Sequence, residues 1–186
     1  MKSVLISIQP KWCELIASGK KTVDVRKTKP KIDVPFKCYI YCTKDGKNLI
    51  KDDVSTTIDF VAVNGGKVIG EFVCDNIITA ECGNYCILPI KETQVDAFDL
   101  LDYADEKTVY GWHISELVIY DKTKELSEFT RFCDGVGGTI GCRGCKYYYS
   151  ESNESIGFYE ECACDNFVPL KRPPQSWCYV EERSRQ

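Results

Sequence analysis

Gly19-Lys20-Lys21-Thr22-Val23-Asp24-Val25-Arg26 is the stretch of this chain that says most about its fold. A short amphipathic segment ends at the glycine, and a valine-containing strand follows. Side chains alternate between the two faces of an extended strand, so Thr22, Asp24 and Arg26 share one face. Three polar groups backed by two valines predict a surface that recognises anions and amides. The alternative is an ordinary half-exposed strand with a solvated polar face.

The flanking residues predict short strands and few helices. Ser3–Ile8 is typical of a buried strand, and a helix over Lys11–Ser18 begins after Pro10 and ends at Gly19. The other expected strands are Val23–Lys27, Phe36–Cys42, Lys67–Ala80, Tyr110–Ile119, Phe167–Leu170 and Trp177–Glu181, and the other expected helices are Glu92–Ala104 and Leu126–Phe132. This order predicts a mainly β (α+β) fold, a small β-barrel with a helix between its first two strands.

Length and composition indicate one domain with a proper core. The chain has 186 residues, of which 44% are hydrophobic. Residues 44–66 are largely polar and predict a surface loop, and residues 133–166 form a Cys-rich insertion with few aliphatic residues. We therefore expect a single domain over residues 1–186 that carries both insertions.

The charge is unevenly distributed. The net charge is −4, yet residues 1–50 carry eleven Lys and Arg against four Asp and Glu. A basic first quarter in an acidic chain favours a local anion site. Lysines that only keep exposed faces soluble are the alternative.

No secretory signal or apolar run of about 20 residues is visible, so we expect a cytoplasmic protein without membrane contact. In a reducing compartment, clustered cysteines favour a metal site over disulfides. Cys142 and Cys145 form a C-x-x-C pair, and Cys162 and Cys164 follow as C-x-C, which predicts a structural zinc site. Cys133 is a spare ligand, and free thiols are the alternative.

Motifs at both ends of the chain carry a family resemblance. Ile6-Ser7-Ile8-x-Pro10-x-Trp12 precedes Gly19-x-Lys21-x-x-Asp24-x-Arg26, and Arg172-Pro173-Pro174-Gln175-Ser176-Trp177 lies near the C-terminus. This combination resembles the ASCH (activating signal cointegrator homology) family of the PUA-like superfamily, in a bacterial and prophage subgroup. Asp24 stands where the family usually has Glu.

The resemblance implies a PUA-like barrel with a cleft that binds RNA, a nucleotide or a modified nucleoside. Lys21 and Arg26 would contact phosphate, Asp24 would accept from a base amine, and Trp12 and Trp112 would stack on bases. Ser7 completes the expected set. Core packing is the alternative for the tryptophans, and a surface ion pair is the alternative for Asp24 and Arg26.

Two other functions remain open at this point. One branch of the superfamily is an N4-acetylcytidine amidohydrolase, whose lysine and glutamate would correspond to Lys21 and Glu71. The branch's threonine is replaced by Asp24, so the cluster would have to activate water. A protein-interaction module built on the Cys-rich insertion is the third hypothesis. His113 and Cys13 are expected to be structural.

Overall fold

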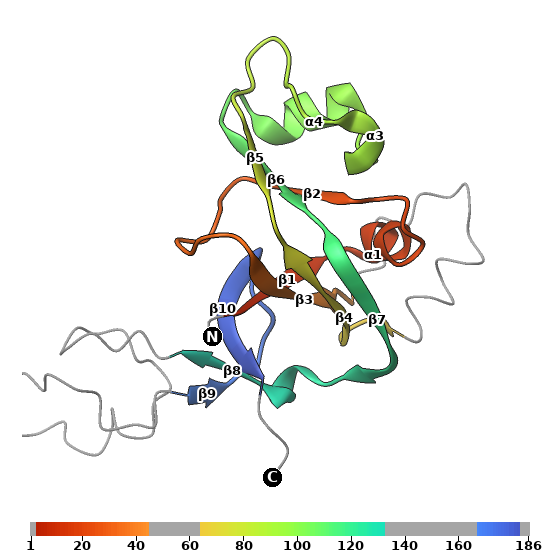
Figure 1. Cartoon of the computed structure of the whole chain (residues 1–186), viewed down its shortest axis with the longest axis vertical. Helices are drawn as coiled ribbons and strands as arrows, with labels where there is room; N and C mark the ends of the chain where they lie inside the picture. Colours follow the sequence, from red (N-terminus) through yellow and green to blue (C-terminus); the bar gives the residue numbers. More distant parts are fainter. Residues whose placement is uncertain (1–2, 45–63, 133–166, 183–186) are drawn as a thin grey trace, which may run out of the picture.

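The structure is a computed structural model that describes residues 3–44, 64–132 and 167–182 (Figure 1). Residues 45–63 of the first predicted insertion and the whole of the second, residues 133–166, lie outside the described residues. The elements are β1 (Ser3–Ile8), α1 (Pro10–Ala17), β2 (Val23–Arg26), β3 (Phe36–Cys42), β4 (Val68–Cys74), β5 (Ile77–Ala80), α3 (Ile90–Thr93), α4 (Ala97–Ala104), β6 (Val109–His113), β7 (Ser115–Lys124), η1 (Leu126–Glu128), β8 (Phe129–Phe132), β9 (Phe167–Pro169) and β10 (Trp177–Glu182).

The strands of the described residues form two sheets. The larger sheet has the order β7-β4-β3-β1-β10-β8-β9, and a three-stranded sheet has the order β2-β6-β5. β1 pairs in parallel with β3 and antiparallel with β10, so the first strand lies inside the large sheet. The expected class, mainly β with a helix between the first two strands, is confirmed. The large sheet curls into a half-barrel, with α3 and α4 at the top of Figure 1, above the smaller sheet.

A shared core joins the two sheets and α1. Alternate residues of β1 and β3 face this core, which also holds Cys13 and Ile16 of α1 and Trp112 of β6. The opposite face of the large sheet packs a second cluster that includes Leu5, Tyr39 and Phe129. Because both faces are covered, every residue of β1 is buried.

Two predicted strands are each divided between the sheets. Lys67–Ala80 is interrupted at Asp75 and Asn76, where the chain passes from β4 to β5. Tyr110–Ile119 is interrupted at Ile114, between β6 and β7. The two crossings lie together, since the His113 backbone N–H donates to the Asn76 carbonyl at 2.9 Å. Apolar residues lie on both sides of each crossing, which is why each region was predicted as one strand.

The two later predicted helices are also corrected. Glu92–Ala104 is broken because Gln94 adopts a left-handed conformation (φ 55°) and Asp96 begins a new helix, its carboxylate accepting from the Phe98 backbone N–H at 2.9 Å. Leu126–Phe132 is a short 3-10 turn, η1, followed by β8.

Candidate functional site

A cleft of about 680 Å³ opens where the end of β1 meets α1, β2, α4 and the segment before β10. A volume of this size suits a small organic ligand. Five of the residues predicted from sequence line it: Ser7, Trp12, Lys21, Asp24 and Arg26. The residues of the N-terminal motif, from Ser7 to Arg26, thus lie together at one cleft.

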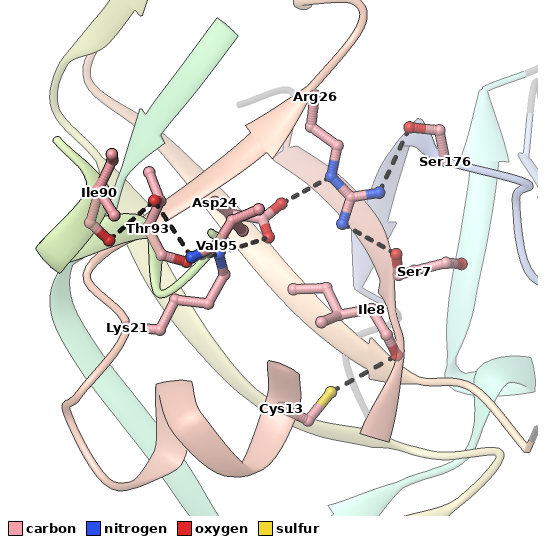
Figure 2. A network of polar contacts seen from close by, with 10 residues as sticks. All are labelled: Ser7, Ile8, Cys13, Lys21, Asp24, Arg26, Ile90, Thr93, Val95 and Ser176. Atoms are coloured by element: carbon pink, nitrogen blue, oxygen red, sulfur yellow. Dashed lines mark hydrogen bonds and ion pairs between the residues drawn. The ribbon is translucent and has the colours of Figure 1, made fainter. Parts of the chain in front are cut away.

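Three charged side chains lie buried at this cleft. Lys21, Asp24 and Arg26 are 2%, 4% and 9% exposed. The Arg26 Nε atom donates to Asp24 Oδ2 at 2.6 Å, and the Lys21 Nζ atom is 4.0 Å from Asp24 Oδ1 (Figure 2). Two cations around one carboxylate leave this triad with an excess positive charge. The half-exposed polar strand considered as an alternative is therefore not what forms.

The local backbone directs Lys21 into the interior. α1 ends through a turn in which Gly19 has a φ of +73° and the Lys21 backbone N–H donates to the Leu15 carbonyl at 3.0 Å. The next N–H, of Thr22, donates to the Glu92 carbonyl at 2.9 Å, which ties β2 to α3. The Lys21 side chain then reaches the Thr93 carbonyl, with its Nζ atom at 2.5 Å.

The surroundings of Lys21 disfavour its charged form. Burial lowers the pKa of its ammonium, and the neighbouring Arg26 charge lowers it further, while Asp24 acts in the opposite direction. Thr93 supplies one acceptor for a group that carries three N–H donors. A ligand oxygen at the cleft would therefore find donors on Lys21 that Thr93 does not use.

Arg26 ties β2 to two other parts of the chain. Its Nη2 atom donates to the Ser7 carbonyl at 2.9 Å, and its Nη1 atom lies 3.4 Å from the Ser176 hydroxyl. The Ser7 hydroxyl in turn donates to the Pro174 carbonyl at 2.7 Å. The guanidinium fork is thus fixed by neighbours from β1 and from the segment before β10.

Aromatic side chains stand on two walls of the cleft. Trp12 of α1 is half-buried, with the Nζ atoms of Lys11 and Lys21 at 4.4 and 4.9 Å from its ring centroid. Tyr103 of α4 is 41% exposed, and the Lys27 Nζ atom lies 5.0 Å from its ring centroid. Planar ligands can stack on such rings.

Trp112 and Glu71 lie elsewhere. Trp112 is fully buried and packs edge-on against Phe36 at 5.7 Å between ring centroids, so it belongs to the core and cannot stack on a base. Glu71 lies on the opposite face of the large sheet, where it accepts from Lys37 Nζ at 2.7 Å and from the Tyr120 hydroxyl. The predicted Lys21–Asp24–Glu71 cluster is not brought together, because strand pairing directs Glu71 away from α1.

Several residues of the cleft were not predicted from sequence. Tyr103, Asp99, Gln175 and Ser176 reach it from distant parts of the chain. The RPPQSW motif pointed to the segment that carries Gln175 and Ser176, but the position of α4 could not be inferred from any motif.

The four predicted zinc ligands, Cys142, Cys145, Cys162 and Cys164, lie outside the described residues. Within the ranges that the structure describes, no group of three or more His, Cys, Asp or Glu side chains could hold a metal ion. A disulfide joins Cys82 and Cys86, a pairing that the sequence interpretation did not foresee. The prediction for Cys13 is confirmed: it is buried and donates to the Ile8 carbonyl.

The fold and cleft define a curled β domain with a buried charged triad at a ligand-sized opening. No family model matches the chain, and no curated protein matches it. Among solved structures, it is similar to ASCH from Zymomonas mobilis, with 18% identity and a TM-score of 0.47 over 67% of this chain and 73% of that one. Two point mutants of that protein also match at 18% identity, with TM-scores of 0.48 (68% and 77% coverage) and 0.47 (67% and 74%).

These solved structures are described as ASCH, the family that the motif at residues 19–26 resembles. Their low identity and TM-scores assign neither a ligand nor a subgroup to this chain. Among the helices of the described residues, none combines the length and apolar character needed to cross a bilayer.

Proposed function

We propose that this chain binds RNA, or a nucleotide or modified nucleoside derived from RNA, in the cleft around Lys21, Asp24 and Arg26. The supporting observation is the burial of all three charges at one ligand-sized opening. Burying charge is costly, and sites that do so are commonly functional. A triad with one excess positive charge suits a ligand that carries an anionic group.

Each part of a nucleotide has a complementary group at the cleft. The unused donors of Lys21 suit a carbonyl or phosphate oxygen, and Asp24 Oδ1, the oxygen not bonded to Arg26, suits an exocyclic amine. The rings of Trp12 and Tyr103 suit the flat face of a base. Gln9 and Gln175, both exposed at the rim, offer amides that can both donate and accept.

Binding is tested by fluorescence anisotropy with labelled single-stranded and structured RNA over a salt series. We expect salt-sensitive binding that Trp12→Ala weakens by about 1–3 kcal/mol, the usual contribution of one stacked base. Arg26→Ala should weaken binding further, provided that circular dichroism shows it to be folded. Lys122→Ala on β7 is the control, since Lys122 is exposed and does not line the cleft. Absence of binding at low salt, to RNA and to mononucleotides alike, would reject the proposal.

Hydrolysis of an N-acylated nucleoside such as N4-acetylcytidine is the second candidate. The observation that favours it is the burial of Lys21, which lowers the pKa of its ammonium and so increases the fraction of unprotonated amine that can accept a proton. Asp24 would be the carboxylate partner, because Glu71 is on the other face of the sheet. Mass spectrometry of N4-acetylcytidine incubated with the protein is the test. Turnover no greater than that of Lys21→Ala would end this candidate.

The predicted zinc site and the protein-interaction surface of residues 133–166 remain proposals. Zinc analysis of protein purified without chelator should give one ion per chain, and Cys142→Ser with Cys145→Ser should abolish it. A zinc content well below one per chain would remove the metal from the description of this insertion.

A further inference from the structure

The two sides of the cleft carry opposite charge. On the β2 side, Arg26 and Lys27 line it, and Lys29 and Lys31 follow in the segment to β3 (residues 27–35). On the α4 side, Asp99 lines the cleft, and the acidic residues Asp96, Asp102 and Glu106 are exposed along and just beyond the same helix, where Asp105 forms an ion pair with Lys107. A polyanion that leaves the cleft is therefore repelled by α4 and attracted by the β2 side.

Two lysines, one in the cleft and one outside it, lie close to aromatic rings. The Lys27 Nζ atom is 5.0 Å from the Tyr103 ring centroid, inside the cleft. The Lys29 Nζ atom is 5.4 Å from the ring centroid of Tyr110, which does not line the cleft. Tyr110 is directly opposite Arg26 in the β2–β6 ladder, so the two side chains share a face of the small sheet. Positive charge therefore continues from the buried triad to a point outside the cleft.

The segment from β2 to β3 is fastened to β10. The Trp177 Nε1 atom donates to the Thr28 hydroxyl at 3.0 Å, and the Lys31 backbone N–H donates to the Tyr179 hydroxyl at 2.7 Å. In Figure 1 this segment projects at the left of the molecule, whereas α1 lies at the right. Cations on a fastened segment lose less conformational entropy when they bind a ligand.

We propose that the cleft holds one nucleotide of a single-stranded RNA, and that the RNA chain leaves from Lys27, which lies over Tyr103 of α4, toward Lys29 and Tyr110 and away from the acidic residues of α4. This inference rests on the proposed function and specifies its ligand as a polymer rather than a free nucleotide. One phosphate lies near Arg26 and Lys27, and the next lies near Lys29. The bound segment is single-stranded, since an unpaired base has to enter the cleft to reach the triad.

Competition against a labelled single-stranded RNA of ten nucleotides tests this path. The competitors are the four ribonucleoside 5′-monophosphates and mixed-sequence tetranucleotides, over a salt series. We expect the tetranucleotides to bind about tenfold more tightly than the monophosphates. Lys29→Ala should weaken tetranucleotide binding several-fold and reduce its salt slope by about one, with monophosphate binding unchanged. Lys122→Ala removes the same charge from β7 and should change neither.

The outcomes separate the two proposals. If monophosphates and tetranucleotides bind equally well and Lys29→Ala has no effect, the cleft takes a free nucleotide and the path is wrong. If Lys29→Ala weakens the monophosphates as much as the tetranucleotides, Lys29 belongs to the cleft itself and the path is again wrong. If nothing binds, the proposed function fails before the question of the path arises.

Discussion

Two clusters of charged side chains on β-strands stand out in the part of the chain that the structure describes, and they differ in burial and in hydration. In the triad at the cleft, Asp24 is 4% exposed and lies between two buried cations. In the other cluster, on the opposite face of the large sheet, Glu71 pairs with Lys37, whose side chain is 42% exposed. Water screens the Glu71 pair, whereas the buried charges of the triad replace their lost hydration by contacts with one another and with the carbonyls of Ser7 and Thr93.

This difference indicates which of the two carboxylates contributes more to the stability of the fold. Both residues are acids on strands and both form an ion pair, so the sequence offers little to separate them. Burial makes Asp24 a residue whose removal leaves two cations unpaired in the interior. The following changes test this contrast, from the largest expected effect to the smallest.

Asp24→Asn should lower the free energy of unfolding by about 3–5 kcal/mol, because breaking a buried ion pair leaves an uncompensated charge behind. Urea denaturation at neutral pH measures the change. Asp33→Asn, at an exposed position, is the matched control and should stay close to wild type. A loss for Asp24→Asn no larger than that of the control would show that the triad contributes little to stability.

Arg26→Lys should cost about 2 kcal/mol, because an ammonium cannot bond Asp24, Ser7 and Ser176 at once as the planar guanidinium does. Thermal unfolding and RNA binding are both measured. Arg172→Lys makes the same chemical change at an exposed position. If Arg26→Lys matches that control in both assays, the three-way contact has no energetic role.

Lys21→Met should change how stability depends on pH. The Lys21 pKa is lowered in the folded protein, so between that pKa and the ordinary value of 10.5 the unfolded chain binds more protons. The contribution of Lys21 to stability therefore rises as the pH rises through this window and is lost as the pH falls through the folded-state pKa. Urea denaturation from neutral pH to pH about 10.5 should show this slope in wild type and a smaller one in Lys21→Met.

Lys20→Met provides the comparison for that series, since Lys20 is the exposed neighbour. It should keep the slope of wild type. Equal slopes for both variants would mean that burial does not perturb the Lys21 ammonium.

Glu71→Gln should cost at most about 1 kcal/mol, as expected for a partly exposed pair. Burial opposes ionisation of Glu71, but hydrogen bonds from Lys37 and Tyr120 hold its pKa below the ordinary 4.5. Its contribution is present above pH 4.5 and is lost as the pH falls through the lowered pKa, so the variant should differ from wild type mainly above that range. Glu81→Gln, exposed beyond β5, is the control in urea denaturation. A loss as large as that of Asp24→Asn would remove the contrast between the two clusters.

Local pattern was enough to predict much of the fold. β1 and β3 were predicted at their observed bounds, and α1 was placed to within one residue. The two strands are short apolar runs, α1 has a helical apolar period, and each has a proline or glycine near an end. The two regions that cross between sheets were predicted as single strands. A change of sheet is decided by pairing partners, which local sequence does not contain.

The same limit applies to the site. Lys21, Asp24 and Arg26 are close in sequence, so their joint position at the cleft followed from one motif. Trp112 was expected to stack on a base, but the pairing of β2 with β6 places it opposite Asp24 in the core, and local sequence does not contain that pairing. Glu71 was assigned by resemblance, and the strand pairing that turns it to the other face is a long-range property.

The position of β1 between β3 and β10 has a consequence for how the protein is made. The hydrogen bond from Ser7 to Pro174 joins residues 167 positions apart. At about 5–20 residues per second, a ribosome needs on the order of ten seconds or more to supply the second partner. Throughout that time the apolar β1 has an unfilled edge, and the cleft lacks the wall that Gln175 and Ser176 provide. The nascent chain is thus exposed to mispairing, and its binding site is complete only once residues 174–176 have been made.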